Sequence, residues 1–140
     1  MKRFIYYALS FTWGLPLTII GLLGGASLLI MGYKPKRWLY GYCFEVGRCW
    51  GGFNAGPIFF CCERSDASLK NHEFGHSLQN CVYGVFTIFI VCIPSVIRYW
   101  YREIRTYKGL ENKTDYDAVW FEGQATKWGE RFYREHGEIE

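Results

Sequence analysis

The chain is short of histidine and of net charge, and both scarcities narrow its possible roles. Three of its 140 residues are histidine, and 16 Lys and Arg against 13 Asp and Glu leave a net charge of +3. A chain this weakly basic has no surface that indicates nucleic acid as a partner. Its length suits one domain with a modest core and excludes two independent domains. No internal repeat divides it.

Charge is missing altogether from Phe4–Tyr33, a run of thirty residues with basic residues on both sides. This length and these flanks predict a membrane-embedded segment, residues 1–33, ahead of a single domain at residues 34–140. A straight transmembrane helix of about twenty residues, kinked or entered near Pro16, fits within the run. A short helical hairpin lying partly in the bilayer is the alternative. A cleaved secretory signal fits less well, because its apolar region would be shorter and would end in a small-residue cleavage site.

The six cysteines follow neither the spacing of a simple disulfide nor that of a CxxC zinc clip. Cys61 and Cys62 are adjacent, and two others lie inside an apolar run. Small buried thiols in a reducing cytosol explain this pattern better than disulfides do. A Cys43–Cys49 disulfide across a hairpin stays open as an alternative.

Local patterns predict an α+β fold that is mainly helical. Aromatic and β-branched residues occupy residues 38–63, which predicts two or three short strands that include a β-hairpin. Glycines break this stretch, and we expect turns near Gly47-Arg48, Gly51-Gly52 and Gly56-Pro57. Residues 65–68 offer N-cap candidates for a following helix. Thr114 and Asp117 predict the start of a last helix, which ends near Gly129 or a turn or two later.

Two of the three histidines lie four residues apart, in the HExxH sequence of His72–His76. On a helix this spacing places both imidazoles on one face, about 6 Å apart, where they can share one metal ion. Glu73 lies at the edge of the same face, where its carboxylate can take a proton from a metal-bound water. This arrangement is typical of zinc hydrolases that use the glutamate as general base. The alternative is that the two histidines merely cap the helix or line a polar face.

A catalytic zinc needs a third protein ligand, which HExxH does not supply. One class of zinc protease has a histidine six residues after the motif, but Val82 stands there and excludes that class. Another class uses a glutamate on a later helix in an ExxA setting, and Glu122 offers it. We therefore predict Glu122 as the third ligand. The alternatives that stay open are Glu63, Asp66, Asp115, Asp117 and His136.

A second uncharged run, Ser77–Ile97, constrains this choice. If the run crossed the bilayer, Glu122 would lie on the opposite side from the histidines, beyond about 30 Å of hydrocarbon. A zinc–oxygen bond of roughly 2 Å cannot reach that far. We therefore predict that the run bends at Gly84 or Pro94 and is a buried or re-entrant segment packed against protein.

Together these residues resemble a family of small, mostly uncharacterised bacterial HExxH proteins that associate with membranes. The resemblance covers most of the chain and rests on an apolar opening at Trp13–Gly21, on Gly51–Gly56, on His-Glu-Phe-Gly-His-Ser-Leu-Gln, on Gly84 with Ile93-Pro94-Ser95, and on a late aromatic helix carrying Glu122. The opening is its least specific part. The family is similar to the gluzincin peptidases, and it implies a location in the bacterial inner (cytoplasmic) membrane.

The resemblance implies Zn²⁺ as the cofactor, with His72, His76 and Glu122 as ligands and Glu73 as base. One departure concerns Thr126, which lies four residues after Glu122, where such helices often carry Asp or Asn to orient a zinc histidine. A threonine hydroxyl would do this more weakly.

We therefore predict a membrane-associated zinc metallopeptidase whose partners are a peptide or protein substrate and membrane lipids. The segment Gly52–Phe60 would bind substrate as an added strand, and Tyr83, Tyr116 and His136 are equal candidates for an oxyanion partner. The alternatives are a non-catalytic membrane protein with a structural or relic metal site, and an immunity or partner-binding protein with an accidental HExxH.

The stretch after the second uncharged run supports contact with the membrane. Arg98, Arg102 and Arg105 have helical spacing and would meet anionic lipid headgroups. The alternative is a solvated helix face. The neighbouring Tyr99-Trp100-Tyr101 fits an interfacial aromatic belt or ordinary packing.

Overall fold

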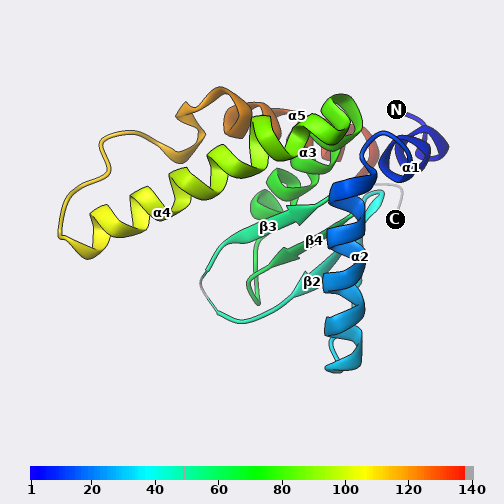
Figure 1. Ribbon diagram of the computed structural model, residues 1–140, viewed down its shortest axis with the longest axis horizontal. Helices are drawn as coiled ribbons and strands as arrows, with labels where there is room; N and C mark the ends of the chain where they lie inside the picture. The colour runs from blue at the N-terminus through cyan, green and yellow to red at the C-terminus, as the bar shows by residue number, and fades with distance from the viewer. Residues whose placement is uncertain (49, 138–140) are drawn as a thin grey trace.

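The computed structural model describes residues 1–48 and 50–137, and a mixed four-stranded sheet lies near its centre (Figure 1). The strands are β1 (Lys36–Trp38), β2 (Gly41–Glu45), β3 (Gly52–Ala55) and β4 (Ile58–Cys61), in the order β1-β2-β4-β3. The β2–β4 pair is parallel and the other two pairs are antiparallel. The α+β class, mainly helical, is thus confirmed, although the sheet is larger than the predicted two or three strands.

The predicted hairpin is present as β3 and β4, which turn at Gly56 with a φ of +72°. The glycines at 47 and 51 do not form a second hairpin. They lie in the connection that carries the chain from β2 past β4 to the sheet edge, so β3 is an edge strand. This crossover requires pairing between residues distant in sequence, which local turn signals do not report.

Helices cover both faces of this sheet (Figure 1). On one face, Phe59 and Cys61 of β4 pack in the main core with Phe74 of helix α3 (Ala67–Tyr83) and Phe132 of helix α5 (Trp120–His136). On the other face, helix α2 (Leu15–Ile30) approaches through its glycines, and a Cβ on Gly25 would touch Phe44 and Ile58. Alternating side chains of the strands therefore fill two separate apolar layers.

The N-terminal uncharged run forms two helices, α1 (Arg3–Phe11) and α2, with a change of direction of 94° between them. One straight helix of about twenty residues is therefore not formed, and the run breaks just before Pro16, where the sequence predicted a kink or a helix start. Pro16 lies in the first turn of α2, where its missing N–H costs little, so a new helix begins there instead of α1 continuing. The side chains of Tyr6 and Ser10 on α1 are fully buried.

The second uncharged run also bends, as predicted. Helix α3 begins after Asp66, whose carboxylate accepts a hydrogen bond from the N–H of Leu69. It ends at Gly84, which has a φ of +57° and touches the ring of Trp13 so closely that no side chain would fit. A 3₁₀ turn, η1 (Gly84–Phe86), a π-helical turn, η2 (Ile88–Cys92), and helix α4 (Ile93–Tyr107) follow.

The chain changes direction by 115° between residues 67–86 and residues 88–107. Among the described residues, no individual helix combines the length and the apolarity needed to cross a bilayer. Each of the two bent pairs, α1 with α2 and α3–η1 with η2–α4, meets that requirement when its halves are taken together.

The C-terminal helix differs from its prediction at its start. A 3₁₀ turn, η3 (Tyr116–Ala118), precedes α5, and Val119 is the N-cap, so the cap predicted from Thr114 and Asp117 is wrong. The end at His136 lies two turns beyond Gly129, within the predicted range. The side chain of Asp117 is engaged elsewhere, with Thr126.

Among the described cysteines, Cys43, Cys61 and Cys81 are buried free thiols, and Cys62 and Cys92 are partly buried free thiols. This agrees with the prediction of buried thiols. The alternative Cys43–Cys49 disulfide involves Cys49, which lies outside the described residues.

Helices α3 and α5 touch through two glycines. A Cβ on Gly75 would overlap the carbonyl oxygen of Ala125, and a Cβ on Gly129 would overlap that of Asn71. Both partners are backbone atoms in regular helices, so they cannot move aside without separating the helices. The two backbones are therefore in direct contact, and only glycine fits at these two positions.

We expect Gly75→Ala to push α5 away from α3. Overpacking at a tight contact costs about 1–3 kcal/mol of unfolding free energy, which exceeds the gain of up to about 1 kcal/mol from replacing glycine in a helix. Chemical denaturation measures the change, and Lys127→Ala, on the exposed side of α5, is the control. Wild-type stability of Gly75→Ala would contradict the close contact.

Candidate metal centre

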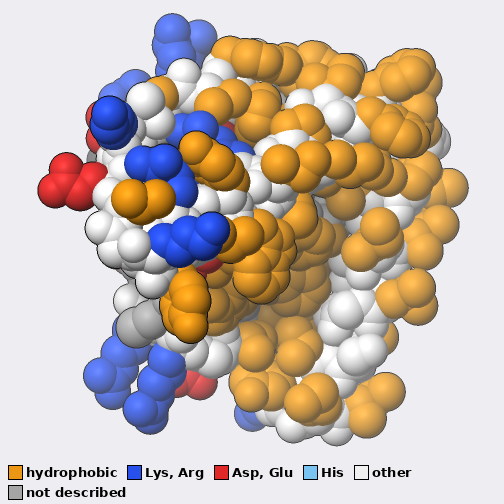
Figure 2. Space-filling model, turned by 60° about the vertical axis from the view of Figure 1, so that its left-hand side comes forward, with side chains coloured by type: hydrophobic (Ala, Val, Ile, Leu, Met, Phe, Trp, Pro, Cys, Tyr) orange, Lys and Arg blue, Asp and Glu red, His pale blue; other side chains and the backbone are white. Residues whose placement is uncertain are grey.

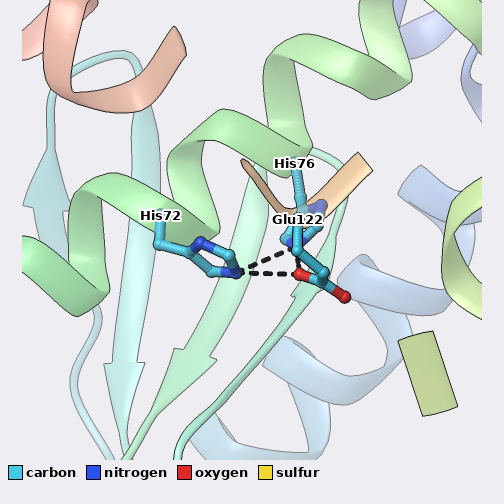
Figure 3. Close-up of side chains that lie close together, drawn as sticks. All are labelled: His72, His76 and Glu122. Carbon is cyan, nitrogen blue, oxygen red and sulfur yellow. Dashed lines mark hydrogen bonds and ion pairs between the residues drawn. The ribbon is translucent and has the colours of Figure 1, made fainter. Parts of the chain in front are cut away.

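The two histidines of α3 and Glu122 of α5 converge on one point (Figure 3). The Nε2 atoms of His72 and His76 each lie 3.2 Å from Oε2 of Glu122 and 3.2 Å from each other. A tetrahedral zinc ion with bonds of about 2.0–2.1 Å holds its donor atoms about 3.3 Å apart. The three residues thus form a group that can hold a metal ion, and their donor set and spacing fit zinc.

The hydrogen bonds on the far side of each imidazole set its tautomer. Nδ1 of His76 lies 2.7 Å from Oε1 of Gln79, and the amide nitrogen of Gln79 donates to the carbonyl of Phe121, at 2.7 Å. Since this fixes Oε1 as an acceptor, Nδ1 of a neutral His76 carries the proton and Nε2 keeps its lone pair.

His72 is held in the same way by α5. Its Nδ1 lies 2.7 Å from the hydroxyl of Thr126, which in turn donates to Oδ2 of Asp117, at 2.8 Å. The hydroxyl therefore accepts from Nδ1–H, and Nε2 of His72 is also left with a lone pair. The weaker orientation expected of Thr126 is thus offset by a carboxylate behind it.

Glu122 completes the group as a carboxylate. Its side chain is fully buried, and its other oxygen, Oε1, accepts a hydrogen bond of 2.5 Å from Ser95 on α4. Three acceptor atoms therefore face one another at 3.2 Å, an arrangement that repels itself unless a cation lies among them.

Glu73 lies beside this group, at the wall of the adjoining cleft. Its side chain packs against Gly52 of β3 so closely that a Cβ there would overlap the carboxylate. Burial raises the pKa of Glu73 to about 7, and the nearby Glu122 charge adds to the shift. A buried carboxylate that lines the cleft can take a proton there and return it.

A cleft of about 500 Å³ opens in front of the histidines and Glu73. Its walls come from the first three turns of α3, from Gly52, Phe53 and Asn54 of edge strand β3, and from one face of η2 and α4. Glu122 lies behind the histidines and does not line the cleft. The cleft is thus the route by which a ligand reaches the metal-binding atoms.

The structure separates the alternatives that the sequence left open for the third ligand. Among the described residues, only Glu122 joins the two histidines in a group of possible metal ligands. Asp66 caps α3, Asp117 accepts from Thr126, and His136 stacks on Phe132. Each of these three side chains therefore has a partner other than the two histidines.

Of the three candidates for an oxyanion partner, only Tyr116 lines the cleft. Its ring lies 6.3 Å from that of His72, and burial raises the pKa of its phenol to about 12, so it is a neutral donor. Tyr83 donates to Gln124 instead.

The arginines of α4 bind the loop that leads to η3. Arg98, Arg102 and Arg105 donate to the carbonyls of Asp115, Thr114 and Glu111, at 2.7, 2.5 and 2.6 Å. These bonds hold Tyr116 and Asp117 beside the metal-binding group. Contact of the same arginines with lipid headgroups stays a prediction.

Sequence reasoning missed the roles of Gln79, Ser95 and Asp117. Each acts on a metal-binding residue, directly or through one hydroxyl. The HExxHxxQ spacing of Gln79 was a usable signal, because position i+3 of a helix faces His76. Ser95 and Asp117 gave no signal, since they lie on other elements.

Comparisons of the chain with protein-family models, with curated proteins and with solved structures give no match. The resemblance to gluzincin-like membrane proteins therefore stays a prediction. The geometry of the site is the basis on which a function can be inferred.

Removing the partners of the histidines should weaken metal binding without abolishing it. We expect Gln79→Ala and Thr126→Val each to lower zinc affinity about 10–100-fold, because the imidazoles lose their fixed tautomer and orientation. Competition with a chromophoric chelator measures the affinity. Thr114→Val, at an exposed site in the loop before η3, is the matched control. Unchanged affinity in both variants would show that these hydrogen bonds do not orient zinc ligands.

Proposed function

We propose that this protein is a membrane-associated zinc metallopeptidase. The observation that supports it most directly is the meeting of three acceptor atoms, 3.2 Å apart, on His72, His76 and Glu122. The ExxA setting of Glu122, the base Glu73 and the adjoining cleft supply the other parts that a hydrolase needs. A purely structural zinc site has no use for a buried, unpaired base at its side.

Each part of the site has a separate role in the proposed reaction. When bound, zinc supplies a Lewis acid that activates water near neutral pH and polarises a carbonyl. Glu73 accepts a proton from the attacking water as its oxygen bonds to the carbonyl carbon. It then gives that proton to the amine nitrogen as the C–N bond breaks. The phenol of Tyr116, which lines the cleft, would donate to the carbonyl oxygen, where negative charge develops.

Within the segment Gly52–Phe60, which was predicted to bind substrate as an added strand, strand β3 is the part that can pair with a peptide. It lies at the edge of the sheet and lines the cleft, so its free backbone groups can pair with an extended peptide. Strand β4 lies between β2 and β3 and has both edges occupied. We therefore assign the added strand to Gly52–Ala55 alone.

Association with a membrane is supported by exposed apolar side chains. Leu23 and Ile30 of α2 are 65% and 88% exposed, and Ile97 and Trp100 of α4 are 64% and 60% exposed. Such surface is costly in water, and a bilayer removes the cost. The two bent helix pairs that together reach the length of a membrane span carry these side chains.

Glu73→Gln tests the catalytic function. We expect peptide hydrolysis to fall about a hundredfold or more, because the amide cannot accept the proton, while zinc content stays at the wild-type level. Mass spectrometry of a peptide mixture gives the activity, and elemental analysis gives the zinc.

One further variant, compared with the zinc-loaded wild type, makes this test decisive. Glu122→Ala should lose both zinc and activity, since it removes a ligand. If the zinc-loaded wild type hydrolyses no peptide, or Glu73→Gln is as active as the wild type, the proposal is wrong. The first of these outcomes would favour the non-catalytic metal site.

A further inference from the structure

We propose that the substrates are membrane-anchored polypeptides, cut where an apolar segment gives way to a polar, basic flank. The inference rests on the proposed peptidase function and names the class of substrate for that site. Two independent observations support it: the cleft has one apolar and one charged end, and its rim continues into an exposed apolar face.

The side chains that line the cleft change from apolar to charged along its length. Its inner end, by the bend between α3 and α4, is lined by Leu17, Val91 and Val96. Its outer end is lined by Asp66, Arg102 and Glu103. Val91 and Glu103 lie on the same continuous helical segment, roughly 18 Å apart along its axis. An extended peptide of about five residues covers that length, so its two ends would meet different environments.

Helix α4 connects the cleft to an apolar surface. Ile93, Ile97, Trp100, Ile104 and Tyr107 recur at steps of four and three residues, which places them on one stripe. All five are between 45% and 93% exposed. The residues that line the cleft, among them Val96, Tyr99 and Glu103, occupy the neighbouring face of the same helix. The apolar stripe of α4 therefore borders the cleft directly.

Arg98 and Arg105 occupy the remaining side of α4, away from both the stripe and the cleft. Arg98 and Arg105 bind carbonyls of the loop at residues 111–115, which keeps their charge off the stripe. Figure 2 shows hydrophobic side chains over much of one face of the molecule, with Lys and Arg gathered to one side. A bilayer matches such a surface, because it offers hydrocarbon to the stripe and an interface to the charged side.

The charged end of the cleft favours a basic flank. Asp66 and Glu103 supply two carboxylates there. Arg102 is the cation at this end, but its guanidinium donates to the carbonyl of Thr114 and lies 5.8 Å from the ring centre of Tyr116. Two carboxylates against one guanidinium leave an excess of negative charge at this end, which complements Lys or Arg beside the apolar segment of the substrate.

The test uses full-length, zinc-loaded protein in liposomes of zwitterionic and anionic phospholipid. The probe is a mixture of synthetic peptides, each with a Leu/Ala segment of about twenty residues joined to a randomised polar flank. A second mixture carries the same flanks without the apolar segment. We expect cleavage of the anchored mixture close to the boundary, with basic flanks enriched among the products, and little cleavage of the soluble mixture.

Two variants probe the two ends of the cleft. Val96→Arg places a charge at the apolar end and should slow cleavage of anchored peptides about tenfold or more. Its control is Leu110→Arg, the same kind of change at an exposed loop position that does not line the cleft. Glu103→Lys should lower the preference for basic over acidic flanks roughly fivefold, as expected for an exposed charge. Retained zinc affinity shows that each variant is folded.

The outcomes separate this inference from the function on which it rests. If the soluble mixture is cut as fast as the anchored one, the inference is wrong and the peptidase function stands. If neither mixture is cut, both are wrong. If the protein fails to float with liposomes and instead dimerises through the α4 stripe, a second copy covers this face and the inference is overturned.

Discussion

The close contact between α3 and α5 is the constraint on which the rest of the site depends. Glycine at positions 75 and 129 lets each backbone touch a carbonyl of the other helix. At that separation, a carboxylate in the first turn of α5 reaches the two imidazoles of α3. A methyl group at either position would separate the helices and carry Glu122 away from the histidines. The geometry of the candidate metal site thus depends on the absence of a side chain at these two glycines.

Around this contact, hydrogen bonds convert three flexible side chains into a preorganised donor set. Gln79 and the Thr126–Asp117 pair hold the imidazoles, and Ser95 holds the carboxylate. These partners come from α3, α4, η3 and α5. The hydrogen bond from Ser95 to Glu122 therefore also connects helix α4 to helix α5. The repulsion among the three acceptors is the local cost of this arrangement, and a bound cation would remove it.

The same bend that brings the chain back to the histidines also forms the cleft. Because the run after α3 turns by 115° instead of continuing, α4 faces α3 and β3 across an open space. One side of α4 then lines the cleft, another binds the loop that carries Tyr116, and the third exposes an apolar stripe. A single amphipathic helix therefore links the proposed chemistry to the proposed membrane surface.

Sequence alone determined the features with local causes. The four-residue spacing of His72 and His76, the Asp66 cap and the glycine at position 84 predicted the helix, its start and the bend after it, because each acts within one or two turns. The choice of Glu122 was predicted from its ExxA setting, and the bend in the second uncharged run was then inferred from that choice, because a run that crossed the bilayer would have separated Glu122 from the histidines. Only the tertiary structure decided the features that depend on contacts between distant elements. These are the parallel pairing of β2 with β4, the 94° change of direction between α1 and α2, and the roles of Ser95 and Asp117. Such contacts arise from packing between segments far apart in the chain, and no local pattern encodes that packing.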